Sequence, residues 1–125
     1  MRISVSPTRR DGRFIVSEAP GVRSRATVIL EATADTVPAG TVLVQDGGAA
    51  RAAVAGDDYA VTPFAGILYA DAPKADAVRP VAVVDRDAEV SDADTIRPDA
   101  AADAALEAAG VRIRSTAATV GIAGL

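Results

Sequence analysis

The stretch Arg79-Pro80-Val81-Ala82-Val83-Val84-Asp85 decides the fold class, because it is the strongest strand signal in the chain. Its apolar residues follow one another without a polar interruption, and valine, a β-branched residue, dominates them. Such a run is typical of a strand in a sheet that is covered on both sides. Pro80 lacks a backbone donor, so it should lie at a sheet edge or at the first position of the strand.

Shorter β-prone runs precede this strand. They cover residues 27–30, 41–44 and 64–69. The sequence Val37-Pro38-Ala39-Gly40 predicts a turn before the second of them, with Pro and Gly at favoured turn positions. Gly66 inside the third run indicates a bulge or a close backbone approach. Apart from Arg51, residues 49–55 are small and apolar, and their pattern fits a short helix as well as a strand.

One helix is predicted late in the chain. Pro98 suits its first position and Gly110 lies just past its end. The spacing places apolar and acidic residues on separate faces: Ala102, Leu106 and Ala109 on one, Asp99, Asp103 and Glu107 on another. Val111-Arg112-Ile113-Arg114 then alternates at period two, as a half-buried strand does. We therefore predict a small α+β domain, rich in short strands, with one late α-helix.

The first 27 residues differ in composition from the rest. They contain prolines, glycines and several arginines but little apolar content, so we predict a flexible N-terminal arm over residues 1–27 and a folded domain over residues 28–125. Phe14-Ile15-Val16 is the only β-prone patch in this arm. The arm is either a disordered terminus or a segment that orders when residues 14–16 pair with a strand edge of a partner.

The composition of the 125 residues excludes several classes of protein. Without histidine or cysteine there can be no Ser-His-Asp or Cys-His catalysis, no His or Cys zinc site and no disulfide. The net charge of −4 argues against nucleic acid as a partner, and no apolar run is long enough to span a membrane. We expect neither an enzyme nor a cofactor. With only two Phe and two Tyr, the core should be thin, which favours oligomerisation or binding to a scaffold.

One acidic set invites a functional interpretation. Asp85, Asp87 and Glu89 are spaced by two and would share a face if all three lay in one strand. Such a face could bind Ca²⁺ in a carbohydrate-binding or adhesion module, or supply a carboxylate pair for glycoside hydrolysis. A solvated strand or turn with salt bridges to Arg79 and Arg86 explains the same residues more simply. We therefore predict no metal site and keep the calcium-dependent module as the alternative.

The order of segments resembles a known family. Gly40-Thr41-Val42-Leu43, Ala65-Gly66-Ile67-Leu68 and Arg86-Asp87-Ala88-Glu89-Val90 occur in an order and at a spacing similar to those of the lambda-type bacteriophage head decoration proteins. The resemblance covers most of residues 13–114. It departs from the family pattern at Ile96-Arg97-Pro98, where an aromatic residue is common.

This resemblance implies a structural virion protein. Its members form trimers that bind the outer surface of an expanded capsid at local threefold positions and stabilise it. The partners implied are further copies of the chain and the major capsid protein, and the location is the outside of the virion. The N-terminal arm is the part that reaches the shell in this family. The residues implied in capsid binding are Phe14, Ile15, Val16, Arg23 and Arg25.

Overall fold

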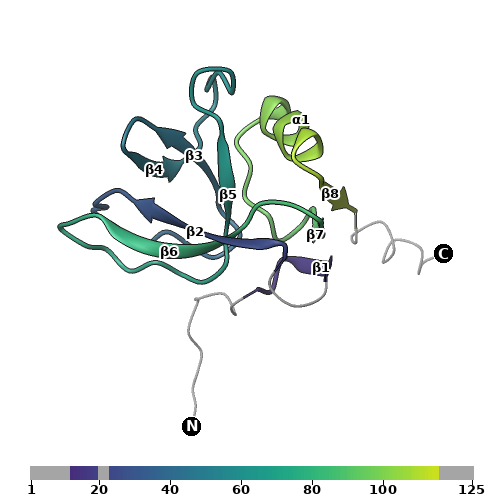
Figure 1. The fold of residues 1–125 in the computed structure, drawn as a ribbon, viewed down its shortest axis with the longest axis horizontal. Coiled ribbons are helices and arrows are strands. Elements are labelled where there is room, and N and C mark those ends of the chain that lie inside the picture. The colour runs from purple at the N-terminus through teal and green to yellow at the C-terminus, as the bar shows by residue number, and fades with distance from the viewer. Residues whose placement is uncertain (1–11, 20–22, 116–125) are drawn as a thin grey trace, which may run out of the picture.

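The computed structural model describes residues 12–19 and 23–115, which form strands and one helix (Figure 1). In chain order the elements are β1 (Ile15–Glu18), β2 (Arg25–Leu30), β3 (Val42–Asp46), β4 (Ala49–Ala52), β5 (Phe64–Leu68), β6 (Arg79–Val84), β7 (Ala88–Ser91), α1 (Ala100–Ala108) and β8 (Val111–Arg114). The described part of the chain contains no helix long and apolar enough to cross a membrane. The predicted α+β class, rich in strands with one late helix, is confirmed.

Five of the strands form a closed barrel in the order β2-β4-β3-β5-β6. Its longest pairing is the antiparallel ribbon of β2 and β6, in register from Arg25 opposite Val84 to Leu30 opposite Arg79. The barrel closes where Leu30 of β2 pairs in parallel with Ala50 of β4. The small apolar segment that fitted two interpretations is therefore a strand over Ala49–Ala52.

The remaining strands form an open sheet in the order β1-β7-β8, which lies with α1 on one side of the barrel (Figure 1). β7 pairs antiparallel with β1 and parallel with β8. The parallel pair requires a crossover connection, and α1 supplies it. The expected alternation along β8 is present, because Val111 is buried whereas Arg112 and Arg114 are exposed.

Two hydrophobic cores share the barrel strands. One core fills the barrel with Leu30, Leu43, Ala50, Leu68, Ala72 and Val83. The other lies between the barrel and the open sheet with its helix, and contains Phe14, Val42, Ile67, Val84, Ala88, Val90, Leu106 and Val111. Neighbouring residues of one strand, such as Val83 and Val84, thus enter different cores. This explains why β6 is apolar on both faces at its end.

The predictions for Gly66 and for the start of the helix can be compared with the structure. The first is confirmed, and the second is wrong by two residues. Gly66 has a φ of 139°, and a Cβ at this position would lie 2.5 Å from Cγ2 of Val83, so the close approach requires glycine. The register with β3 also shifts beside it. The helix begins at Ala100 rather than at Pro98, because Asp99 caps it by accepting a hydrogen bond from the backbone N–H of Ala102.

The predicted arm is where the structure differs most. Phe14 is only 1% exposed, and the residues after it form β1, which pairs with β7. Residues 15–18 therefore already pair with a strand of the folded domain, so residues 14–16 do not need the strand edge of another protein to become ordered. The physical reason is that the core lacks large side chains, and Phe14 supplies one of the two phenylalanines. The predicted boundary between residues 27 and 28 falls inside β2. Residues 1–11 lie outside the described residues.

Candidate functional site

The N-terminal segment is fixed to the barrel at Gly12. Its backbone N–H donates a 2.8 Å hydrogen bond to the carbonyl oxygen of Tyr69, directly after β5. Gly12 has a φ of 67°, and an added Cβ would lie 2.8 Å from Cε1 of the Tyr69 ring. The close contact and the left-handed backbone both favour glycine at this point. Whatever precedes Gly12 therefore starts from a fixed position beside the barrel.

Four further side chains surround this point, and we call the set the anchor cluster: Gly12, Glu18, Ser24, Arg25 and Tyr69. The Arg25 guanidinium donates to both carboxylate oxygens of Glu18, at 2.6 and 3.2 Å, and stacks over the Tyr69 ring 4.1 Å from its centre. The Ser24 hydroxyl also donates to Glu18. The hydrogen bonds from Arg25 are the main reason that the pKa of Glu18 lies below its usual value. The cluster ties β1 to β2 and to the end of β5.

The five residues predicted to bind a capsid differ in their accessibility. Phe14 lies in the core, Ile15 is half-buried, and Arg25 belongs to the anchor cluster. Val16 is 47% exposed, and the Arg23 side chain is 68% exposed with its Nε 3.8 Å from Asp87. All five lie in or next to β1 and the start of β2, which the anchor cluster joins. Their contact with a capsid stays a prediction.

The acidic set does not form the predicted face. Asp85 and Asp87 lie in the turn between β6 and β7, where Asp87 has a φ of 50°, and only Glu89 lies in a strand. Glu89 accepts from Arg114 at 2.6 Å and from Ser17 at 3.0 Å, and the hydrogen bond from Arg114 is the main cause of its lowered pKa. The idea of one strand face is therefore wrong. Among the described residues, no group of three or more carboxylates could hold a metal ion.

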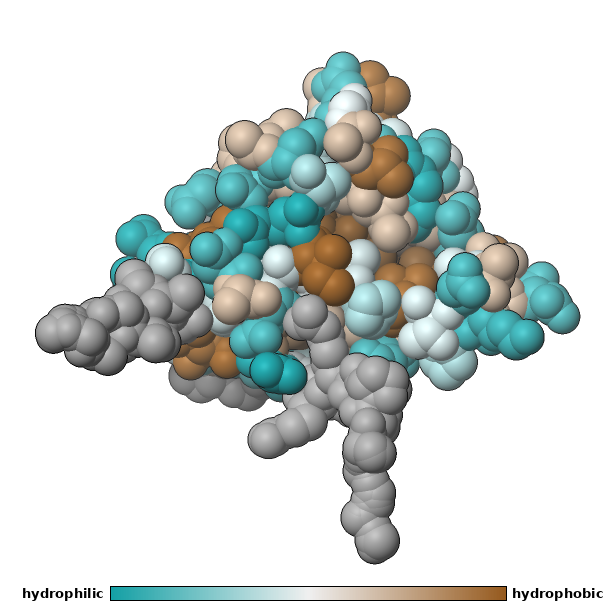
Figure 2. All heavy atoms as spheres, turned by 180° about the vertical axis from the view of Figure 1, so that it is seen from behind, coloured by the Kyte–Doolittle hydropathy of each residue, from teal (hydrophilic) through white to brown (hydrophobic). Residues whose placement is uncertain are grey.

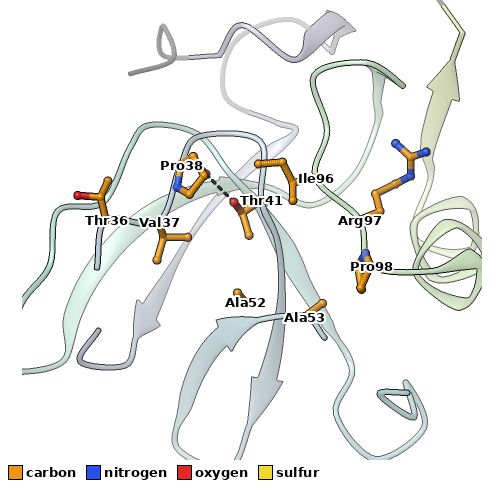
Figure 3. A pocket seen from close by; sticks show the side chains of 9 residues that line it. All are labelled: Thr36, Val37, Pro38, Thr41, Ala52, Ala53, Ile96, Arg97 and Pro98. Atoms are coloured by element: carbon orange, nitrogen blue, oxygen red, sulfur yellow. Dashed lines mark hydrogen bonds between the residues drawn. The ribbon is translucent and has the colours of Figure 1, made fainter. Parts of the chain in front are cut away.

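A hollow that the sequence did not predict lies between the turn before β3, the end of β4 and the segment before α1 (Figure 3). Its volume is about 320 Å³, and its lining is mostly small and apolar: Thr36, Val37, Pro38, Thr41, Ala52, Ala53, Ile96, Arg97 and Pro98. We call it the groove. Its lining comes from three separate segments of the sequence, so no local motif could have predicted it.

The groove has a fixed wall at the place where the sequence departs from the pattern of the family it resembles. Ile96 donates its backbone N–H to the Gly40 carbonyl at 2.8 Å, and its own carbonyl accepts from Val42 at 3.1 Å. The Thr41 hydroxyl donates to the Pro38 carbonyl at 2.7 Å (Figure 3). These bonds hold the strand-like segment before α1 against the start of β3.

These features define a small barrel domain with an open sheet beside it and an N-terminal segment anchored where the two meet. Compared with models of known families, the chain matches the bacteriophage lambda head decoration protein D over residues 5–120, which is most of its length. The chain therefore belongs to this family of structural phage proteins, as the order of its motifs predicted. No curated protein and no solved structure gave a significant match.

Proposed function

We propose that this protein is a homotrimeric cement protein that binds the outer surface of the expanded phage head at local threefold positions and stabilises it. The family match carries the proposal, because it spans residues 5–120 and so includes the segment before the anchor cluster together with the barrel and the sheet. The role of stabilising the head and the capsid as the partner both follow from the decoration function of the family. The partner on the shell is the major capsid protein, and no chemical step is involved.

The region around β1 is the attachment surface in this proposal. Residues 1–11 contain Arg2, Arg9 and Arg10 but only one acidic residue, in a chain whose net charge is −4. Basic groups at this end suit a partner surface that carries carboxylates. Since the anchor cluster fixes Gly12, the segment before it is presented from a rigid base, which lowers the entropy lost on binding.

The five predicted residues divide into two roles. Val16 and Arg23 are accessible and contact the shell directly, whereas Phe14, Ile15 and Arg25 hold β1 in place. β1 is an edge strand of the sheet, and its outer edge has no strand partner within the described residues. A strand of the capsid protein could pair with this edge through main-chain hydrogen bonds. Three such sites in a trimer would raise the effective concentration at the shell.

A binding assay on purified expanded shells tests this attachment. A variant that lacks residues 1–11 keeps Gly12 and Phe14, so we expect an unchanged melting temperature but at least a tenfold loss of affinity for shells. A matched control replaces residues 1–11 by a Gly/Ser segment of equal length, and it should bind as poorly as the deletion. If either variant decorates shells like the full chain, attachment lies elsewhere in the protein.

Two surface substitutions test whether the region around β1 contributes to shell binding independently of residues 1–11. Val16→Asp and Arg23→Glu should each weaken binding to shells without changing the far-ultraviolet circular dichroism. Val61→Asp is the control, because Val61 is 73% exposed in the loop between β4 and β5 and belongs to neither β1 nor β2. Equal binding by all three variants would contradict a role for β1.

A further inference from the structure

The outer face of the open sheet carries polar and charged side chains. Ser17 in β1 lies opposite Glu89 in β7, and Glu89 lies opposite Arg112 in β8. Arg114 shares this face with Arg112, because residues two apart in a strand point to the same side. Val111, which points the other way, is buried in the core between the sheet and the barrel. We call Ser17, Glu89, Arg112 and Arg114 the sheet face.

One arginine of the sheet face has no partner among the described residues. Glu89 accepts hydrogen bonds from Arg114 through one carboxylate oxygen, at 2.6 and 3.1 Å, and from Ser17 through the other, at 3.0 Å. Arg112 is exposed, and its guanidinium makes neither a hydrogen bond nor an ion pair with any described residue. The hydrogen bonds from Arg114 and Ser17 accordingly lower the pKa of Glu89 more than the charge of Arg112 does. Arg112 is therefore left with an unsatisfied fork of donors.

A polar hollow lies beside this arginine. It has a volume of about 300 Å³, and three carboxylates line it together with Arg112. Each of these carboxylates already has another arginine beside it. The pairs are Glu18 with Arg25, Asp87 with Arg23 and Glu89 with Arg114. Arg112 therefore adds a positive charge that no carboxylate of the hollow balances.

The charge of the sheet face contrasts with that of the barrel. Residues 31–76, which include β3, β4 and β5, carry seven carboxylates and two basic groups. From residue 109 onward the sequence has two arginines, Arg112 and Arg114, and no acidic residue. On the side of the molecule in Figure 2, apolar residues form separate patches among hydrophilic ones, so hydropathy alone marks no docking surface there. Charge does distinguish the two regions, and it favours an acidic partner at the sheet face rather than at the barrel.

The sheet face borders the attachment region of the proposed function. Ser17 belongs to β1, whose outer edge has no strand partner within the described residues. Arg23 reaches the hollow through its pair with Asp87. β1 and β8 flank β7 and are two strand spacings apart, which is about 10 Å. A single peptide segment that contacts β1 can therefore also reach Arg112.

We propose that an acidic segment of the major capsid protein lies across the sheet face and places one carboxylate in the hollow, where Arg112 binds it. The inference rests on the proposed function and adds the chemistry of the partner and the residue that recognises it. It does not depend on the oligomeric state. A guanidinium binds a carboxylate through two parallel hydrogen bonds, so arginine suits this position better than lysine.

Binding of variants to purified expanded shells measures the contribution of Arg112. Arg112→Gln removes the charge, and we expect a loss of affinity of about tenfold, as for one hydrogen bond to a charged group. Arg112→Lys keeps the charge without the fork, so its affinity should lie between those of Arg112→Gln and the wild type. Neither change should alter the melting temperature, because the side chain is exposed.

Lys74→Gln is the matched control. It also removes one positive charge at an exposed position, but it lies in the loop between β5 and β6, away from the open sheet. This variant should bind shells like the wild type. If Arg112→Gln binds shells as well as Lys74→Gln does, the inference is wrong.

A zero-length cross-link identifies the partner of residue 112. Lys74 is the only lysine of the chain, so Arg112→Lys places one new side-chain amine on the sheet face. On decorated shells a carbodiimide should join this amine to an Asp or Glu side chain of the capsid protein through an amide bond, found by mass spectrometry of the peptides. The wild type should give no such link. A link only to Glu89, or to an acidic residue of another copy of this chain, would overturn the inference.

The remaining outcomes separate the inference from the proposed function. If the wild type does not decorate expanded shells, the proposed function is wrong and the inference falls with it. If the wild type and Arg112→Gln decorate shells equally well, only the role of Arg112 is wrong. Binding of duplex DNA that Arg112→Gln abolishes would overturn the inference in favour of a phosphate partner.

Discussion

The barrel and the open sheet differ in the kind of surface that each leaves exposed. The barrel closes on itself, so each of its strands has a neighbour on both sides, but the outer side of β2 and β6 is exposed at Thr27, Ile29, Pro80 and Ala82. The sheet covers the barrel with its inner face, but the outer edges of β1 and β8 have no strand partner within residues 12–19 and 23–115. A bare apolar face favours side-chain packing, and a bare edge favours backbone pairing. The two regions therefore expose different kinds of surface.

The two regions are nevertheless one folding unit. β3, β5 and β6 each place one residue in the barrel core and its neighbour in the core shared with the sheet. Removing the sheet would therefore expose one side of three barrel strands. We expect a single cooperative unfolding transition for the whole chain, as is usual for a domain of this size.

Phe14→Ala gives the largest expected effect and tests whether the sheet depends on its first strand. Phe14 is fully buried and packs in the core between the two regions. Truncating a buried phenylalanine costs about 3–5 kcal/mol, a large part of the stability of a small domain. Urea unfolding followed by circular dichroism should show this loss.

Val16→Ala is the matched control for this substitution, because Val16 lies only two residues further on, in β1, but is 47% exposed. It should change the free energy of unfolding by less than about 0.5 kcal/mol. Equal stabilities for the two variants would mean that β1 does not belong to the folded unit. The flexible arm would then include β1, as the composition alone indicates.

Gly66→Ala is expected to have the next largest effect, this time inside the barrel. The added methyl group would meet Val83 at 2.5 Å, and the positive φ of residue 66 is unfavourable for alanine. We expect a loss of about 1–3 kcal/mol, measured by thermal unfolding. Gly48→Ala, where an added Cβ meets nothing within 4 Å, should leave the melting temperature nearly unchanged. A stable Gly66→Ala variant would show that β5 and β6 can separate at this point.

Much of the barrel could be predicted from the sequence, and the position of β1 could not. Residues 41–44 and 83–84 are buried and lie in apolar runs that carry strong β signals, and the helix has its own period and end signals. β1 has only a short β-prone patch in a stretch of arginines and glycines, and its pairing with β7 joins segments more than 70 positions apart (Ser17 and Glu89, for example). Phe14 is buried by residues that are distant in the sequence, and the composition of its own segment does not reveal this.

The candidate site was predictable only in part. The order of three short motifs was enough to predict the family, and the family match confirms it. The prediction that Asp85, Asp87 and Glu89 share a face was wrong, because a spacing of two implies a common face only in a strand. Residues 85–87 form a turn instead. The groove is lined by alanines, prolines and an isoleucine from separate segments, and such residues are unremarkable one at a time. Only the fold shows that they meet.

The smallest expected effect lies at the junction of the two regions and depends on pH. Arg25 lowers the pKa of Glu18 in the folded protein, so the folded value lies below the unfolded one. The ion pair therefore contributes its full stability above the unfolded pKa, which is about 4.3, and loses it as the pH falls through the folded pKa. The melting temperature of the wild type should fall from pH 6 to pH 3 more steeply than that of Glu18→Gln, and the two curves should converge at the acidic end. At neutral pH the free energies of unfolding of the wild type and Glu18→Gln should differ by about 1 kcal/mol. The difference is small because the Arg25 side chain is 32% exposed, and water screens its attraction to Glu18. Glu107→Gln, an exposed change on the helix, is the control and should leave the slope of the wild type unaltered. Parallel curves for the wild type and Glu18→Gln would show that the anchor cluster joins sheet and barrel by packing rather than by charge.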